Sequence, residues 1–483
     1  MVSQAASGLM VKLFIGGQWR DGSEGKSTSF LDPATGESAG SVCLAGRRDV
    51  EEAVEAAGRG SAAWAETPPF ERARILRLAA TGLRKRAERI AELLTTEVGK
   101  PLSQARGEAM SAADTLEWFS EEGKRCFGQV IPGRSTTFHT LTRLEPVGVV
   151  AAFTPWNYPV SQSVKKLAAA LAAGCAVILK GPEEAPAACA EVIKVLAESG
   201  VAPGALNLLF GEPARISELL IAHPVVRSVS FTGSVGVGKQ LAGLAGLYMK
   251  RIVMELGGHA PVIVCEDADL ELAVDELVRM KFLNSGQVCL SPTRFLVARP
   301  VYREFVRQFS HAAQALRVDH GFADGVQMGP VANARRLISV KELVDDARAC
   351  GAQLVCGGEQ IERRGYFFTP TVLSDVPVRA RAMNEEPFGP IALFRSFEAL
   401  DDALVEANRL PYGLASYVYT SALRTEAVVT QRLHAGMVAV NRVFSSTIEA
   451  PFGGVRDSGY GTEGGTQAIR NFLNEKMITR SVG

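Results

Sequence analysis

In the first third of the chain, apolar residues recur at every third or fourth position between charged ones. The stretches 49–65 and 69–98 show this spacing, which predicts two amphipathic helical segments, and Pro68-Pro69 separates them. From about residue 147, short β-branched runs alternate with helical stretches instead. The predicted strands are 148–153, 176–180, 206–210 and 227–231, and the predicted helices are 161–173, 183–199, 214–222 and 237–249.

A second alternating series follows, with strands at 261–265 and 294–298 and helices at 270–282 and 301–316. Strands that alternate with helices of this length favour parallel sheets with helices on both faces. The fold class is therefore predicted as α/β, with two doubly wound layers that meet near 255–258. The last strand-like run, MITRSV, has no obvious partner in this order, which suggests pairing with another subunit.

Composition and charge exclude several classes of protein. The 483 residues are 47% hydrophobic and 22% charged, so the chain is not a disordered one. Lys+Arg and Asp+Glu are both 52, and a balanced chain has no overall field to attract nucleic acid or an anionic membrane. The longest apolar run, 167–179, is too short to span a bilayer, and the first residues lack the pattern of a secretory signal. We expect neither a nucleic acid nor a membrane partner.

The cysteines indicate a reducing compartment. None of them forms a CxxC pair or has a histidine at metal-ligand spacing, so we expect free and mostly buried thiols, a cytoplasmic location and no metal site. The eight are Cys43, Cys126, Cys175, Cys189, Cys265, Cys289, Cys350 and Cys356.

Three polar residues follow predicted strands or helices in settings that suit catalysis. Cys289 lies in a loop of small residues that leaves room for an adduct on a nucleophilic thiol. Glu255 ends an apolar run before two glycines, as a general base in a cleft would. Asn157 lies between two prolines, where a rigid amide can donate to an oxyanion. The structural alternatives are a small buried thiol, a solvated turn glutamate and an ordinary turn asparagine.

The segment 231–239, FTGSVGVGK, follows one predicted strand and opens a helix. Its glycines allow close approach of a phosphate to free N–H groups at the start of the helix. It is nearly a Walker A loop, but Gln240 stands where Ser or Thr would hold magnesium, so we reject an NTPase. A tight turn without a ligand is an equally good interpretation of this loop taken alone.

Seven motifs occur in one order along the chain: PWNYP, VILKGPEE, SFTGSVGVGK, MELGG, NSGQVC, EEPFGP and EAPFGGVRDSGYG. In this order they resemble the NAD(P)-dependent aldehyde dehydrogenase superfamily, over about residues 13 to 480. Among its subgroups, bacterial succinate-semialdehyde dehydrogenase-like enzymes are the most similar.

The resemblance implies roles for the catalytic residues. Cys289 matches the nucleophile, Glu255 the general base, and Asn157 with the backbone N–H of Cys289 the oxyanion hole. Lys166 and Glu463 match a pair that assists proton release. The implied reaction forms a thiohemiacetal and then a thioester on Cys289, which water hydrolyses to the acid. We expect Glu255 to act mainly after hydride transfer, because neighbouring dipoles can favour the thiolate without it.

The cofactor implied is NAD, with NADP as a weaker alternative, because Glu183 would repel a 2′-phosphate. Lys180 and Glu183 match residues that hold the adenosine ribose, Gly233 and Ser234 the pyrophosphate contacts, and Glu386 and Phe388 those at the nicotinamide ribose. The full cofactor-binding set expected from the resemblance is Thr154, Trp156, Lys180, Glu183, Gly211, Gly233, Ser234, Leu256, Glu386 and Phe388.

The resemblance also implies three domains and an oligomer. Residues 1–124 and 147–257 would form an NAD-binding domain, 258–467 a catalytic domain, and 125–146 with 468–483 a small β oligomerisation arm. A homodimer or homotetramer would give the terminal strand its partner.

The small-molecule substrate is expected to be an aldehyde with an acidic group, such as succinate semialdehyde. Family members often bind that group with two arginines, whose positions here hold Lys165 and Leu283. The expected substrate-binding residues are Lys165, Phe444, Ser446, Thr447 and Phe452. Uncharged aliphatic or aromatic aldehydes remain an alternative, as do a thiol esterase without redox chemistry and a protein that only binds.

Overall fold

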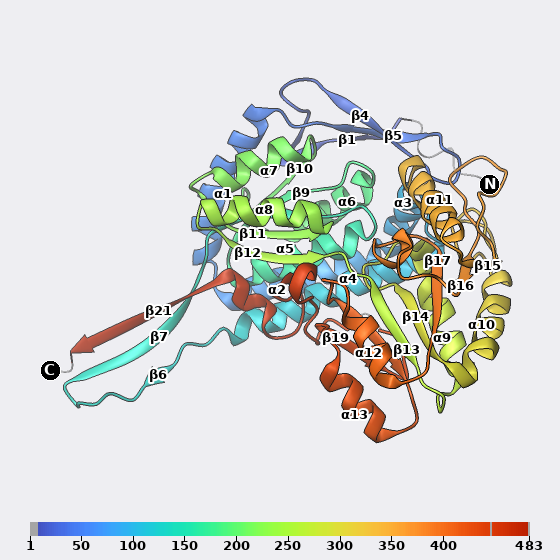
Figure 1. Ribbon diagram of the computed structural model, residues 1–483. Helices are drawn as coiled ribbons and strands as arrows, with labels where there is room; N and C mark the ends of the chain where they lie inside the picture. Colours follow the sequence, from blue (N-terminus) through green and yellow to red (C-terminus); the bar gives the residue numbers. More distant parts are fainter. Residues whose placement is uncertain (1–7, 445–446, 482–483) are drawn as a thin grey trace.

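Residues 8–444 and 447–481 are described by the computed structural model, and they form two large sheets with helices on both faces (Figure 1). The first sheet has eight strands in the order β20-β12-β11-β8-β9-β10-β2-β3, and its five central strands are parallel. Its strands are β2 (Leu13–Ile15), β3 (Gln18–Arg20), β8 (Val149–Phe153), β9 (Ala176–Lys180), β10 (Leu206–Leu209), β11 (Val226–Gly233), β12 (Arg251–Leu256) and β20 (Gly459–Tyr460).

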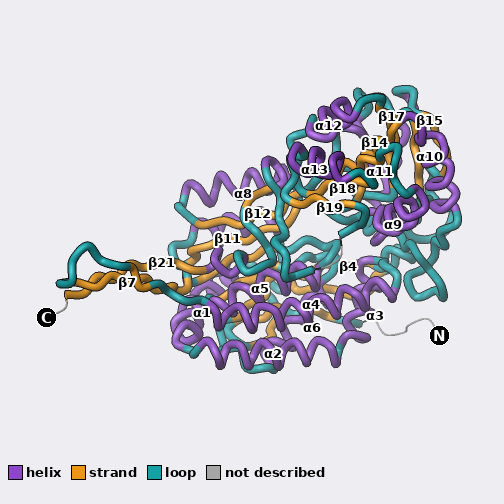
Figure 2. The backbone as a smooth tube through the Cα atoms, turned by 90° about the horizontal axis from the view of Figure 1, so that it is seen from below, coloured by secondary structure: helices purple, strands orange, loops and turns teal. Residues whose placement is uncertain are grey.

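The central strands of this sheet are covered by apolar helices, and β8 and β9 are buried at every position. Helices of the first half pack in successive layers below the sheet, as Figure 2 shows for α2, α4 and α5. The helices are α1 (Arg47–Glu66), α2 (Pro69–Lys85), α3 (Ala87–Val98), α4 (Leu102–Glu122), α5 (Pro159–Ala173), α6 (Pro186–Glu198), α7 (Pro213–Ala222) and α8 (Val235–Leu247).

Only three residues separate the end of β12 from the first strand of the second sheet. Its order is β15-β16-β17-β14-β13-β18-β19. The strands are β13 (Ala260–Val264), β14 (Pro292–Ala298), β15 (Gln353–Cys356), β16 (Thr371–Ser374), β17 (Ile391–Phe397), β18 (Ala415–Tyr419) and β19 (Met437–Val440). The helices are α9 (Leu270–Phe282), α10 (Arg299–Gln314), α11 (Ala334–Ala349), α12 (Leu400–Asn408) and α13 (Leu423–Arg432). The α/β fold with two wound layers is thus confirmed.

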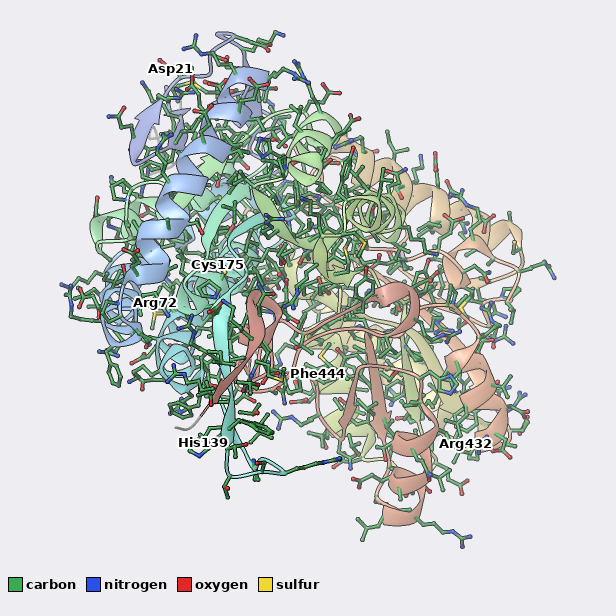
Figure 3. The ribbon with its side chains drawn as sticks, turned by 90° about the vertical axis from the view of Figure 1, so that its left-hand side faces the viewer. Asp21, Arg72, His139, Cys175, Arg432 and Phe444 are labelled. Carbon is green, nitrogen blue, oxygen red and sulfur yellow. The ribbon has the colours of Figure 1, made fainter. Side chains whose placement is uncertain are left out.

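Two small sheets complete the chain. Near the N-terminus, β1 (Met10–Val11), β5 (Ser38–Cys43) and β4 (Ser27–Leu31) form one of them. The other is the arm that projects from the body in Figure 1, with β6 (Val130–Ile131), β7 (Phe138–Pro146) and β21 (Leu473–Ser481). Figure 3 shows the molecule from the side on which the arm projects, and the labelled His139 lies on β7.

The arm corrects the expectation that the terminal strand lacks a partner within the chain. β21 pairs with β7 over nine antiparallel positions, from Leu473 opposite Pro146 to Ser481 opposite Phe138. These two segments are more than 300 residues apart, so no local pattern relates them. Of the helices in the described ranges, none is long and apolar enough to cross a membrane.

Candidate active site

Three side chains singled out from the sequence meet between the two large sheets. Glu255 is the penultimate residue of β12 and is 1% exposed, and Asn157 lies in the turn between β8 and α5. Cys289 lies in the loop between α9 and β14, and its thiol is close enough to Glu255 for each group to affect the pKa of the other. Both Glu255 and Asn157 therefore reach the nucleophile loop from carboxyl ends of parallel strands, where α/β proteins bind ligands.

The nucleophile loop is held in an uncommon backbone conformation. Asn284 and Ser285 have φ angles of +47° and +57°, which non-glycine residues rarely adopt. The Ser285 hydroxyl donates to the carbonyls of Gly329 at 2.8 Å and Pro330 at 3.0 Å. A Cβ at Gly286 would lie 2.1 Å from the Gly389 carbonyl oxygen, so only glycine fits there. This strained turn gives the loop one shape and places Cys289 at its end.

Asn157 has a side-chain amide that can serve an oxyanion. Its Nδ2 donates to the main-chain carbonyl of Gln287 at 3.0 Å, which fixes the orientation of the amide. An amide nitrogen carries two hydrogens, so one donor remains for a substrate oxygen. This geometry suits the stabilisation of charge that develops beside Cys289.

Burial raises the pKa of both reacting groups. The pKa of Glu255 is raised to about 7, first by burial and then by the nearby charge of Glu463. Neither of its carboxylate oxygens has a hydrogen-bond partner within the described ranges. The pKa of the Cys289 thiol is raised well above its ordinary value by burial and then by Glu255. Glu255 itself is one of the groups that raise the pKa of the thiol, so the expectation that it acts mainly after hydride transfer stays a prediction.

Lys166 and Glu463 form a buried ion pair behind Glu255. The Lys166 ammonium also donates to the hydroxyl of Thr232 on β11 at 2.6 Å. The second carboxylate oxygen of Glu463 has no hydrogen-bond partner among the described residues. Glu463 also lines the cavity that contains Cys289, so this pair lies between the cavity and the sheet.

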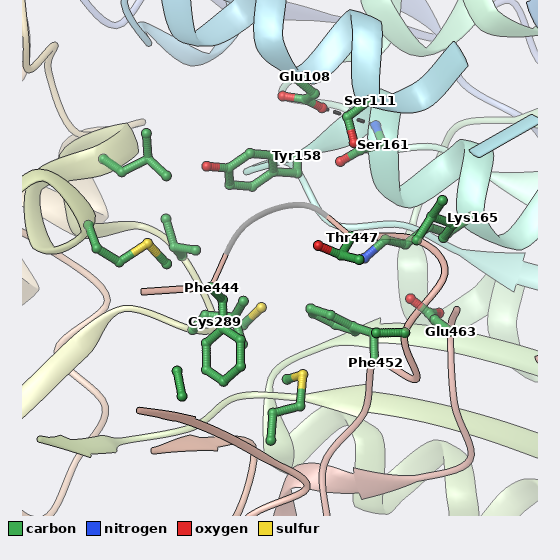
Figure 4. A pocket seen from close by; sticks show the side chains of 18 of the residues that line it. Glu108, Ser111, Tyr158, Ser161, Lys165, Cys289, Phe444, Thr447, Phe452 and Glu463 are labelled. Carbon is green, nitrogen blue, oxygen red and sulfur yellow. Dashed lines mark hydrogen bonds between the residues drawn. The ribbon is translucent and has the colours of Figure 1, made fainter. Parts of the chain in front are cut away.

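The cavity at Cys289 has a volume of about 650 Å³. Phe444, Phe452 and Thr447 line it, as the sequence predicted, and Figure 4 shows them around the thiol. Lys165 lines it too, with its ammonium 3.7 Å from the centre of the Phe452 ring. The predicted residue Ser446 lies outside the described residues.

Sequence reasoning missed Arg442, a second cation in the wall of this cavity. It follows β19 directly, and a lone arginine after a strand gives no local sign that it faces a cavity. Only its position shortly before the EAPFGG motif could have drawn attention to it.

Most of the predicted cofactor residues lie along the carboxyl edge of the first sheet. The Lys180 ammonium donates to Glu183 at 2.6 Å, and the other oxygen of Glu183 accepts the N–H of Gly211 at 2.7 Å. Thr154 donates its N–H to the carbonyl of Lys180 at 3.2 Å. These contacts connect the ends of β8, β9 and β10.

The start of α8 can receive a phosphate group. Ser234 is its N-cap and makes no side-chain capping bond, so the first N–H groups of the helix have no acceptor from that side chain. A Cβ added at Gly236 would meet nothing within 4 Å, which leaves the approach open. Gly233 ends β11 immediately before this turn, and Leu256 at the end of β12 packs beneath Gly238.

Glu386 and Phe388 come from the loop before β17 and face the first sheet. Phe388 packs edge-on against Trp156 with ring centres 5.7 Å apart. Glu386 accepts the N–H of Gly258 at 3.3 Å, and burial raises its pKa to about 8. The residues present thus suit a dinucleotide, with a carboxylate at each end and the start of a helix between them.

Comparison with known proteins agrees with this site. The model of the Aldehyde dehydrogenase family matches residues 19–478. A putative 4-(hydroxymethyl)benzenesulfonate dehydrogenase of Comamonas testosteroni is 47% identical over 97% of both chains. The NADP-linked succinate-semialdehyde dehydrogenase of Escherichia coli K12 is 38% identical over 96% of both chains. The crystal structure of succinate-semialdehyde dehydrogenase from Burkholderia pseudomallei is 37% identical, covers 98% of both chains and superposes with a TM-score of 0.96.

These matches confirm the resemblance drawn from the seven motifs. They support an oxidoreductase that converts an aldehyde to an acid, rather than a thiol esterase or a protein that only binds. The chain belongs to the aldehyde dehydrogenase family.

Proposed function

We propose that this enzyme oxidises an aldehyde with an anionic group at its far end, using NAD and a thioester on Cys289. The observation that carries the proposal is the charge of the cavity wall. Two cations, Lys165 and Arg442, line the cavity. Each of these two cations can donate charge-assisted hydrogen bonds to an anionic group of a substrate.

The catalytic residues divide the reaction into two steps. The Cys289 thiol releases its proton to solvent, and its sulfur attacks the aldehyde carbon while Asn157 donates to the oxyanion. The predicted cofactor residues would hold NAD, which would supply the acceptor for the hydride that leaves that carbon. Glu255 then takes a proton from water, which attacks the thioester and releases the acid and the thiol. Aldehyde, NAD⁺ and water thus give acid, NADH and one proton.

The size and lining of the cavity support a substrate larger than a short chain. Its wall includes Phe444, Phe452, Met280 and Leu290, which suit an aromatic or long aliphatic spacer. The relatives support an acid at the far end, since their names include a benzenesulfonate, a sulfolactaldehyde and the semialdehydes of succinate and glutarate. The same apolar wall favours the second candidate, an uncharged aromatic aldehyde.

Pairs of aldehydes matched in shape test the proposal by the rate of NADH formation. The pairs are 4-formylbenzenesulfonate or 4-carboxybenzaldehyde against benzaldehyde, and succinate semialdehyde against butanal. A charge-assisted hydrogen bond contributes roughly 1.5–3 kcal/mol, so Arg442→Gln should lower kcat/KM for the anionic aromatic aldehydes by about ten- to a hundredfold. Lys165 lies close to Cys289, near enough to affect the pKa of the thiol, so its ammonium can reach the carboxylate of a short substrate. Lys165→Met should therefore act most on succinate semialdehyde.

Arg424 on α13 is exposed and is not part of the cavity wall, so Arg424→Gln is the matched control and should change neither class. Equal losses for charged and uncharged aldehydes in the Lys165 and Arg442 variants would contradict an anionic substrate. A wild-type preference for benzaldehyde and butanal would favour the second candidate.

We further propose a homodimer or homotetramer in the cytoplasm. The outer edge of β21 in the arm has no strand paired to it among the described residues, and Val130 and Met477 on the arm are 82% and 70% exposed. All eight cysteines are free thiols, which supports a reducing compartment. A single-chain mass by analytical ultracentrifugation would contradict the oligomer.

A further inference from the structure

A buried ion pair joins Lys100 to Glu108, a residue of the cavity wall. Lys100 precedes α4 and Glu108 lies on it, and their side chains are 1% and 0% exposed. Removing two charges from water is unfavourable, and such a pair often contributes little to stability compared with apolar residues of the same size. Its presence beside an active site therefore invites a role other than stability.

The side chains of Lys100 and Glu108 both contact the segment that carries Asn157. The Lys100 ammonium donates to the main-chain carbonyl of Asn157 at 3.0 Å and lies 3.9 Å from the centre of the Tyr158 ring. One oxygen of Glu108 accepts the N–H groups of Val160 at 3.0 Å and Ser161 at 3.1 Å, in the first turn of α5. Figure 4 shows Glu108, Tyr158 and Ser161 together at one side of the cavity. The ion pair thus binds the turn at both ends, with Lys100 at the carbonyl of Asn157 and Glu108 at the first N–H groups of α5.

The same carbonyl is tied to the nucleophile loop. The Asn157 carbonyl accepts a second hydrogen bond, from Nδ2 of Asn284 at 3.1 Å, while its own amide donates to Gln287. Asn157 is therefore fixed at its main chain and at its side chain. A small displacement at this point would move the amide away from the oxyanion, and misplacement by about 1 Å can cost about a hundredfold in rate.

We propose that Lys100 and Glu108 are positioning residues, which hold the main chain at Asn157 so that its amide faces the oxyanion formed at Cys289. This inference rests on the proposed role of Asn157. It predicts that the ion pair matters for the rate of acylation only while the Asn157 amide is present.

A double-mutant cycle separates positioning from a purely structural role. Lys100→Met with Glu108→Gln removes both charges together, so no unpaired charge stays buried, and the side-chain amide oxygen introduced by Glu108→Gln can still accept the N–H groups of α5. Asn157→Ala removes the amide. The readouts are the rate of the first NADH turnover, KM, the dissociation constant of NAD and the Tm, each measured with the best aldehyde of the panel above.

Glu97→Gln is the matched control. Glu97 is a buried carboxylate that accepts the N–H groups of Ala187 at 2.6 Å and Ala188 at 2.9 Å at the start of α6, but it does not contact Asn157. Lys100→Arg is a second variant in case the double variant does not fold. It keeps the charge, but the larger guanidinium cannot take the place of the ammonium.

Asn157→Ala should lower the first-turnover rate by about 10²–10³-fold, as loss of an oxyanion donor does. The Lys100/Glu108 double variant should lower it by about tenfold or more, with KM and NAD binding little changed, and by less than about twofold when Asn157→Ala is also present. Glu97→Gln should leave the rate within about twofold of the wild type. If the Lys100/Glu108 substitutions lowered the first-turnover rate by the same factor with and without the Asn157 amide, the inference would be overturned. A folded Lys100/Glu108 variant with the wild-type rate would also overturn it. If Asn157→Ala itself kept the wild-type rate, the proposed role of Asn157 would fail first.

Discussion

At the scale of single residues, the chemistry depends on carboxylates and a thiol buried together. Glu255 has two buried oxygens without hydrogen-bond partners among the described residues, and its pKa is raised to about 7. A base with a pKa near the working pH is best able to take a proton and then release it. Burial and the charge of Glu255 raise the pKa of the neighbouring Cys289 thiol, and Glu255 is placed to take a proton from the water that attacks the thioester on that thiol.

This arrangement predicts a pH dependence. Glu255 acts as a base on the attacking water only when ionised, and its folded-state pKa is raised, so kcat should rise with pH through about 7. Because the charge of Glu463 raises the pKa of Glu255, Glu463→Gln should move this rise to lower pH. Rate profiles between about pH 5 and 9 measure both effects.

Glu255→Gln is the control for these profiles, since it should lose the step near pH 7 and slow turnover by about 10²–10⁴-fold. A Glu463→Gln profile that moved to higher pH would show that the charge of Glu463 does not act on Glu255 in this way.

Site residues that lie in a motif at the end of a strand or helix could be found from the sequence. Site residues with an ordinary local setting could not. Cys289, Glu255 and Asn157 each follow a strand or helix in a motif, so their local setting indicated chemistry. Lys100 and Arg442 have ordinary local settings. Their contacts with Asn157 and with the cavity come from segments far away in the chain.

At the scale of elements, we expect the turn between β9 and α6 to govern the choice between NAD and NADP. Glu183 accepts Lys180 and the N–H of Gly211, which leaves a fixed carboxylate at the end of the sheet. A carboxylate accepts ribose hydroxyls and repels a 2′-phosphate, so kcat/KM should be higher with NAD than with NADP. Glu183→Gln removes the repulsion and should reduce the preference by about tenfold.

Steady-state rates with both cofactors check this prediction. Glu184 is the matched control, because it is the next residue and pairs with Arg335 on the surface. A higher kcat/KM with NADP in the wild type would mean that Glu183 does not face the adenosine ribose.

The elements themselves differ in how well their patterns predict them. The buried strands β8 and β9 and the helix between them were predicted closely, because continuous apolar runs and alanine-rich segments mark them. The short strands β1 to β5 were missed, since two to six residues are too few to show a period. The partner of β21 was missed because pairing between distant segments leaves no local signal.

At the scale of the whole molecule, the fold places two sheets so that their loops form one site. The first sheet supplies Glu255, Asn157 and most of the predicted cofactor residues, and the second supplies Cys289 and Glu386 from loops before its strands. The reaction therefore depends on the two sheets being held in a fixed position relative to each other. Sequence motifs predicted this convergence, whereas the cavity between the sheets is a property of the folded chain alone.

The most direct test of the account is the mass of the enzyme after one turnover. Glu255→Gln, mixed with NAD and the best aldehyde of the panel, should release close to one NADH per chain and hold the acyl group as a thioester on Cys289, found by peptide mapping. Cys289→Ala should give neither NADH nor an acylated peptide while still binding NAD. NADH formation by Cys289→Ala, or an acyl group on another cysteine, would contradict the central claim.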